Sequence, residues 1–99
     1  MVKREIVWSQ RAKIKLYDIL RFFAERNQSK SYSEKLYKKF NKELKLLVKQ
    51  PDLGLKTEIE SVRGLIIDDY ILFYEVTADK IIVLTVWDCR QNIEDLKIK

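Results

Sequence analysis

The spacing of apolar residues changes at the segment 51–54, and this change constrains the fold more than any other feature of the sequence. Before it, apolar residues recur every three or four positions, which is typical of amphipathic helices. After it, β-branched and aromatic residues follow one another closely, which favours strands. We therefore predict a helical part and a sheet-forming part within a single domain over residues 1–99, because a chain of this length leaves no room for two domains.

Before the two helices, a strand is predicted over residues 2–8, where side chains alternate between two faces. Ser9 is placed to cap a helix over about residues 11–26. A second helix is predicted from Ser31, because Glu34 three residues later completes a capping-box pattern. The few polar residues between the two helices predict an antiparallel hairpin.

The sheet-forming part predicts three strands. The first covers residues 57–62, and Gly64 is expected to turn the chain. The second covers residues 65–76, and the third is the apolar run 81–87, expected to be central and buried on both faces, with a turn at 77–80 before it. Successive strands with short connections pair antiparallel. The expected fold class is α+β with two layers: an N-terminal strand, an antiparallel two-helix hairpin, then three antiparallel strands.

The composition excludes several kinds of site. The sequence has no histidine, which excludes a Ser-His-Asp triad and a histidine zinc site. It has one cysteine, Cys89, which excludes an internal disulfide and a thiolate zinc cluster and is expected to be a small buried packing residue. We therefore expect no metal and no cofactor. The charged N-terminus and the lack of a long apolar run predict a cytoplasmic protein without a membrane partner.

The charge is divided unevenly along the chain. Residues 1–50 hold 14 Lys and Arg against 5 Asp and Glu, whereas residues 51–99 hold 6 against 10. A basic half indicates a polyanion or an acidic protein as partner. The alternative is a pair of solvated helices that use lysine for solubility. The lysines of the second helix that we consider for partner binding are Lys35, Lys38, Lys42 and Lys45.

Three segments resemble the RelE/ParE superfamily of toxins. Residues 69–76, DYILFYEV, resemble the middle strand of that family, and residues 81–92 resemble its last strand, where an apolar run ends in a polar Arg-Gln-Asn cluster. Residues 51–54 are similar to the Pro-x-x-Gly that follows the second helix. The resemblance covers about residues 3–96 and implies a small bacterial toxin of a type II toxin–antitoxin pair. It also implies a RelE/ParE-like fold.

The resemblance implies two partners. One is a cognate antitoxin that neutralises the toxin, in this family through an extended and often acidic segment that folds on binding. The other is the target, which is DNA gyrase for ParE-like members and the ribosome with its mRNA for RelE-like members. The basic lysines of the second helix would attract either the antitoxin segment or a nucleic acid.

A nuclease needs a proton acceptor, a proton donor and cations around one phosphate. If the chain is an mRNA endonuclease, its candidates are Arg63 and Arg90 as phosphate ligands and Glu58 as base. However, RelE-like nucleases carry an arginine after the middle-strand tyrosine, where this chain has Ile71, and lysines where it has Glu58 and Glu60. We therefore favour a ParE-like toxin without nuclease activity. An mRNA endonuclease and a non-toxic basic nucleic-acid-binding domain remain the alternatives.

The polar cluster after the last strand is the strongest candidate for binding a target or partner, because a buried strand would present it rigidly. Asp88 and Arg90 are two residues apart, so the alternative is that they pair with each other. The cluster consists of Asp88, Arg90, Gln91 and Asn92.

Four aromatic residues are expected mainly in the core. Tyr70 and Tyr74 share one strand face and are expected to pack inside. Trp8 and Trp87 stand at strand ends, where packing is again expected. The alternative for the tryptophans is that they border a groove for the antitoxin, because aromatic residues anchor protein interfaces.

Overall fold

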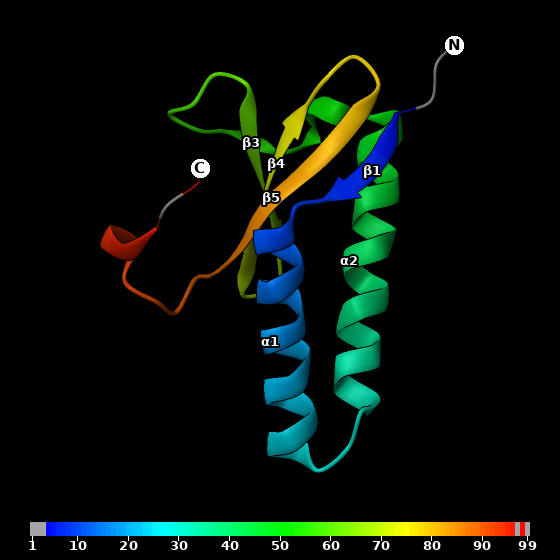
Figure 1. The fold of residues 1–99 in the computed structure, drawn as a ribbon, viewed down its shortest axis with the longest axis vertical. Coiled ribbons are helices and arrows are strands. Elements are labelled where there is room, and N and C mark those ends of the chain that lie inside the picture. The colour runs from blue at the N-terminus through cyan, green and yellow to red at the C-terminus, as the bar shows by residue number, and fades with distance from the viewer. Residues whose placement is uncertain (1–3, 97, 99) are drawn as a thin grey trace.

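The computed structural model describes residues 4–96 and 98 (Figure 1). Val2 and Lys3, which belong to the predicted first strand, lie outside the described residues. Two short 3₁₀ turns accompany the helices and strands. The elements in chain order are β1 (Glu5–Trp8), α1 (Gln10–Asn27), α2 (Ser31–Lys49), η1 (Pro51–Leu53), β2 (Leu55–Lys56), β3 (Val62–Ile67), β4 (Tyr70–Val76), β5 (Lys80–Asp88) and η2 (Ile93–Asp95).

The strands form one sheet in the order β1-β5-β4-β3-β2. β3, β4 and β5 pair antiparallel, which confirms the predicted antiparallel pairing of the C-terminal strands, although the bounds of two of these strands differ from the prediction. β1 joins the edge of the sheet and pairs parallel with β5, so the sheet is mixed. The helical hairpin packs on one face, and its far end extends beyond the sheet (Figure 1). The α+β class with an N-terminal strand and a helical hairpin is therefore confirmed.

The predicted strand over residues 57–62 is wrong. Residues 57–61 form a loop, in which the Thr57 hydroxyl donates to the carbonyl oxygen of Val62 at 2.9 Å and accepts from the Ile59 N–H at 3.2 Å. These local bonds compete with a strand ladder for the same backbone groups.

Gly64 does not turn the chain, because it lies inside β3 opposite Phe73. A Cβ at Gly64 would stand 3.0 Å from Ile71 Cγ2 and 3.2 Å from the Phe73 ring, so glycine avoids two close contacts at this strand position. The turn falls instead at Asp68, whose φ of 53° is left-handed, and it divides the predicted strand 65–76 into β3 and β4. Aspartate tolerates this backbone conformation better than most residues.

The helix starts illustrate one correct and one wrong prediction. Ser9 caps α1, with its Oγ accepting from the Ala12 N–H at 3.1 Å. The capping box at Ser31 does not form, because Ser31 is already helical and the N-cap position is Lys30. The Ser31 N–H is satisfied by the hydroxyl of Ser29 at 3.2 Å instead.

The sheet has apolar side chains on both faces. The main core lies between the hairpin and the sheet and includes Phe40, Leu72 and Val83. A second cluster on the other face is formed by Val62, Phe73 and Trp87, with Leu96 and Ile98 of the C-terminal segment packed against it. β5 is thus covered on both sides as predicted, and the chain after β5 supplies part of the cover.

Candidate functional site

A cleft lies where β5 ends and the chain passes beside α1. It has a volume of about 440 Å³. It brings together three of the four residues of the predicted polar cluster, Asp88, Arg90 and Gln91, with Tyr70 of the neighbouring strand. We call it the β5 cleft; its lining residues are Lys15, Asp18, Ile19, Phe22, Tyr70, Val86, Asp88, Arg90 and Gln91.

Asp88 and Arg90 form a two-pronged ion pair in this cleft. Arg90 Nε donates to Asp88 Oδ1 at 3.0 Å, and Arg90 Nη2 donates to Asp88 Oδ2 at 2.9 Å. The backbone N–H of Arg90 also donates to Oδ1 at 2.9 Å. These bonds hold the pKa of Asp88 below its usual value and raise that of Arg90, so both groups are charged at neutral pH. The pairing that we considered from their spacing is therefore present.

The pair still leaves a donor for a ligand. Arg90 Nη1 makes no hydrogen bond to any described residue, and the Arg90 side chain is 53% exposed. Asp88 fixes the plane of the guanidinium, so a carboxylate or phosphate oxygen would meet a preoriented donor. An apolar wall stands opposite, because Phe22 is half exposed and Ile19 is partly buried.

Tyr70 packs at the base of the cleft. Its side chain is buried and meets the Phe40 ring edge-to-face, with the ring centres 5.9 Å apart. Its hydroxyl is 3.5 Å from Arg90 Nη2. Burial raises the pKa of Tyr70, so the phenol stays protonated at neutral pH and does not supply a base. The expectation that Tyr70 packs in the core is confirmed.

Arg63 and Arg90 lie at opposite ends of the sheet. Arg63 pairs in register with Tyr74, and Asp88 pairs with Tyr70, so the two sites are separated by roughly 13 Å along β4. Arg63 Nη1 donates to the carbonyl oxygen of Gly54 at 2.9 Å, and its side chain is 23% exposed. The structure does not bring these two arginines to one phosphate.

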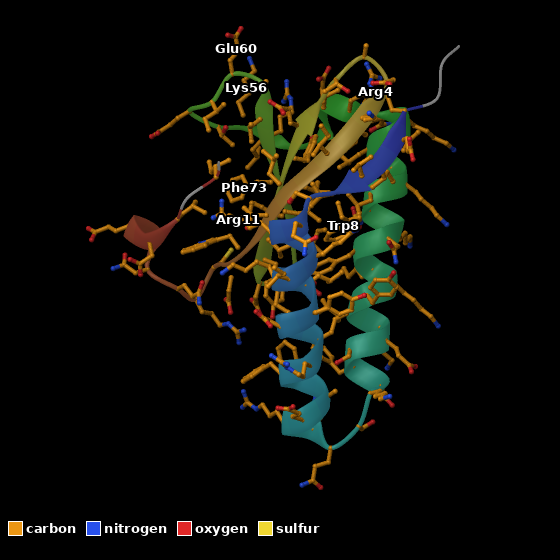
Figure 2. All side chains as sticks on the ribbon, in the orientation of Figure 1. Arg4, Trp8, Arg11, Lys56, Glu60 and Phe73 are labelled. Atoms are coloured by element: carbon orange, nitrogen blue, oxygen red, sulfur yellow. The ribbon has the colours of Figure 1, made fainter. Side chains whose placement is uncertain are left out.

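The remaining nuclease candidate and its neighbour also lie away from the β5 cleft. Glu58 and Glu60 are exposed in the loop after β2, and Figure 2 shows Glu60 and Lys56 at the end of the molecule opposite the hairpin tip. Asn92 is absent from the cleft lining, and its Oδ1 accepts from the Glu94 N–H at 3.1 Å at the start of η2.

Cys89 is exposed, so the prediction of a buried packing residue is wrong. It follows the last residue of β5, where the chain leaves the sheet and its side chain is no longer covered. Partial burial and the nearby carboxylates of Asp88 and Asp69 raise the pKa of its thiol. A raised pKa lowers the thiolate fraction, which makes Cys89 a poor nucleophile at neutral pH.

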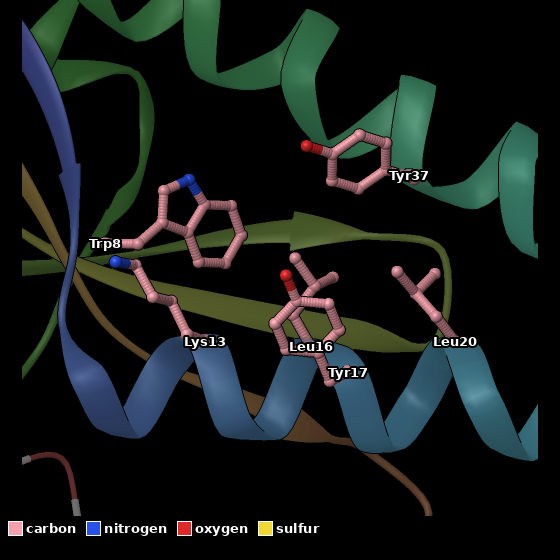
Figure 3. A pocket seen from close by; sticks show the side chains of 6 residues that line it. All are labelled: Trp8, Lys13, Leu16, Tyr17, Leu20 and Tyr37. Carbon is pink, nitrogen blue, oxygen red and sulfur yellow. The ribbon is translucent and has the colours of Figure 1, made fainter.

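A second hollow lies between the two helices. Figure 3 shows its floor at Leu16 and Leu20, with Trp8, Tyr17 and Tyr37 around it. A neighbouring hollow shares Tyr17, Leu20 and Tyr37 and continues toward the hairpin tip, and each hollow is about 380 Å³. We call the two together the interhelical groove.

The interhelical groove was only partly predictable. Trp8 lines this groove, which agrees with the alternative that a tryptophan at a strand end borders a groove, whereas Trp87 packs on the opposite face of the sheet as expected. Tyr17, 70% exposed, and Tyr37, 46% exposed, were missed. The signal was present, because both are aromatic residues that stand outside the apolar stripe of their helix.

The lysines of α2 lie outside the β5 cleft. The four that we considered for partner binding are exposed on the helix surface. Lys39 differs from them, because its Nζ bonds Asp68 at the turn between β3 and β4, 2.5 Å away. Within the residues that the structure describes, no group of acidic or cysteine side chains could hold a metal ion, and neither helix has an apolar stretch that would cross a bilayer.

Comparisons with known proteins cover most of the chain. Residues 6–93 match the family described as "ParE toxin of type II toxin-antitoxin system, parDE". A solved chain from the "Chromosomal ParDE TA system from P. aeruginosa" is similar, with a TM-score of 0.71 and 17% identity over 87% of this chain and 96% of that one. At this identity the likeness shows a shared fold. No curated protein matches the chain.

Proposed function

This chain belongs to the ParE family of type II toxins, and we propose that it inhibits bacterial growth by binding DNA gyrase and is neutralised by a cognate antitoxin. The observation that carries the proposal is the family match over residues 6–93, together with the likeness to a chain of a ParDE system. Membership of the family makes the chain a type II toxin. DNA gyrase as its target and neutralisation by an antitoxin are what we propose.

We infer that the β5 cleft contacts the target. It combines a preoriented arginine with an exposed aromatic side chain, and these are the residue types that anchor protein interfaces. Arg90 is fixed by Asp88, and Phe22 stands on the facing helix. A rigid cation beside an apolar wall suits a protein surface that presents a carboxylate next to an apolar side chain.

The positions of the nuclease candidates favour gyrase over mRNA cleavage. Cleavage requires the acid, the base and the cations to surround one phosphate within hydrogen-bond reach. Arg63 is held by Gly54 at the far end of β4 from Arg90, and Glu58 lies in the loop after β2. Bringing them together would require a rearrangement of the sheet end.

The antitoxin is proposed to cover the interhelical groove. Its tyrosines and Trp8 offer rigid aromatic area, and Lys13, Arg21 and Lys30 stand along its length. An amphipathic segment with acidic residues at its edges would match both features, which corresponds to the helix-in-groove mode of recognition.

The test is induced expression in a bacterial culture without antitoxin, with growth, mRNA integrity and the DNA-damage response followed together. We expect growth arrest with intact mRNA and an induced damage response. Arg90→Gln should relieve the arrest, whereas Arg4→Gln should not, because Arg4 is bonded to the Thr77 carbonyl at the other end of the sheet. Arrest with fragmented mRNA, relieved by Arg63→Gln as well, would replace the gyrase proposal with the nuclease.

A further inference from the structure

Five lysines form a straight stripe along α2. With about 100° of rotation per residue, they fall within a sector about 80° wide. The stripe runs over 14 residue steps, which corresponds to about 21 Å of helix at 1.5 Å per residue. We call it the lysine stripe; it consists of Lys35, Lys38, Lys42, Lys45 and Lys49.

The lysine stripe faces away from the protein. The buried residues Leu36, Phe40, Leu44 and Leu47 lie on the opposite side of the helix, about 180° from the centre of the stripe. Figure 2 shows side chains that end in nitrogen projecting from the side of α2 away from α1. The stripe is therefore a surface that the fold leaves open along most of the helix.

The charges of the stripe are not neutralised locally. None of its five lysines forms a hydrogen bond or an ion pair with the part of the chain that the structure describes. Of the two acidic residues of α2, Glu43 lies on the side toward the core, and Glu34, four residues before Lys38, borders the stripe but forms no ion pair with the described residues. Lys39, which forms an ion pair with Asp68, lies about 40° beyond the edge of the stripe.

The chemistry of the stripe argues against a membrane surface as its partner. A helix that lies on a membrane inserts its apolar face between the lipids. The apolar face of α2 is buried in the main core, and Leu46, 44% exposed, is the large apolar side chain left beside the stripe. One leucine is a weak anchor compared with a whole apolar face.

The same chemistry argues against a protein partner. Protein interfaces are enriched in aromatic residues and arginine and are depleted in lysine. The stripe has neither an aromatic residue nor an arginine, whereas the interhelical groove has Trp8, Tyr17 and Tyr37. A row of flexible ammonium groups without neighbouring anchors fits evenly spaced phosphates, which need only positive charge.

We propose that the lysine stripe binds the phosphate backbone of duplex DNA without sequence preference. A stretch of duplex about 21 Å long carries roughly twelve phosphate charges, at one charge per about 1.7 Å of helix axis, so it offers more charges than the five lysines of the stripe can neutralise. This surface is separate from the β5 cleft and from the interhelical groove. The inference therefore stands whether the target is gyrase or another protein.

The test measures binding of the purified full-length protein to fluorescent duplexes of about 20 base pairs at several salt concentrations. If all five lysines neutralise phosphates, the slope of log K against log salt is about −4.5, which weakens binding roughly 500-fold between about 50 and 200 mM salt. Two duplexes of unrelated sequence should bind equally. A single-stranded RNA and an acidic peptide serve as competing ligands.

Variants of matched charge locate the contact. Lys38→Gln, Lys42→Gln and Lys45→Gln together should reduce the slope to about −1.8, because three contacts are removed. A control set with the same loss of charge off the stripe, Lys39→Gln, Lys56→Gln and Lys80→Gln, should keep the original slope. Glutamine is as good a helix former as lysine, so the helix should persist, and circular dichroism checks this.

Three results would overturn the proposal. One is a salt slope of the unmodified protein near zero. Another is an equal loss of binding in the two sets of variants, which would show that DNA binding depends on the net charge of the protein and not on the stripe. The third is tighter binding of the acidic peptide or the RNA than of the duplex at the same salt concentration. If the triple variant unfolds, Lys42→Gln with Lys45→Gln replaces it, with an expected slope of about −2.7.

Discussion

The hydroxyl of Tyr74 joins the end of α2 to the sheet, and its removal by Tyr74→Phe is expected to destabilise the protein. The buried Gly54 N–H donates to the Tyr74 hydroxyl at 2.9 Å, and the hydroxyl donates to the Pro51 carbonyl oxygen at 2.8 Å. The ring itself is fully buried in β4. Phenylalanine keeps the ring but leaves one buried N–H and one carbonyl without their partner.

The magnitude follows from the unpaired groups. A buried polar group that loses its partner costs about 1–3 kcal/mol, and the Pro51 carbonyl can partly recover by bonding water. We expect the free energy of unfolding to fall by about 2 kcal/mol. For a domain of about 100 residues this lowers the Tm by roughly 8–16 °C. The variant should still fold, because domains of this size are stable by about 5–15 kcal/mol.

Thermal unfolding followed by circular dichroism measures the change, and Tyr70→Phe is the matched control. Tyr70 is on the same strand and the same buried face, but among the described residues its hydroxyl bonds only Arg90 Nη2, at 3.5 Å. Its loss should cost less than about 0.5 kcal/mol. Equal effects of the two substitutions would show that ring packing, and not the bridge to Gly54 and Pro51, sets the stability at Tyr74.

Three further predictions concern single sites. Gly54→Ala should destabilise the protein by at least as much as Tyr74→Phe, because a Cβ at Gly54 would lie 2.6 Å from the Tyr74 hydroxyl oxygen. Chemical denaturation measures the change, and a free energy of unfolding equal to that of the unmodified protein would refute the close contact. Asp88→Asn should lower stability at about pH 6, but this difference should shrink as the pH falls below about 4. The reason is that the pKa of Asp88 is lowered in the folded state by Arg90, so its stabilising effect is present above the unfolded pKa and is lost in acid; a difference independent of pH would contradict the ion pair. Cys89 should react with iodoacetamide at pH 7 more slowly than a small free thiol despite its exposure, because its pKa is raised; a faster rate than that of the free thiol, measured by mass spectrometry, would refute this.

The elements of the candidate site were visible in the sequence, but their arrangement was not. Asp88, Arg90 and Gln91 could be proposed because they follow an apolar run that had to be a buried strand. Their neighbours in the cleft, such as Phe22 and Tyr70, come from α1 and β4 and meet them only in the folded chain.

The separation of Arg63 from Arg90 was equally hidden in the sequence. It depends on the register of β3 against β4 and of β4 against β5. Gly64 shows the difficulty, because an isolated glycine indicates a turn, whereas this one lies inside β3 opposite Phe73, whose ring leaves little room for a Cβ there.

The sequence by itself determined the features that depend on neighbours along the chain: the two helices, the cap at Ser9, the end of α2 before Pro51 and the strand character of the second half. Helical periodicity and capping involve residues three or four positions apart, so their signals stay local. Only the tertiary structure decided the parallel pairing of β1 with β5, the bridge of Tyr74 to Gly54, the β5 cleft and the interhelical groove. These depend on contacts between residues that are distant in the chain, and their geometry is set by how the packed faces of helices and sheet fit together.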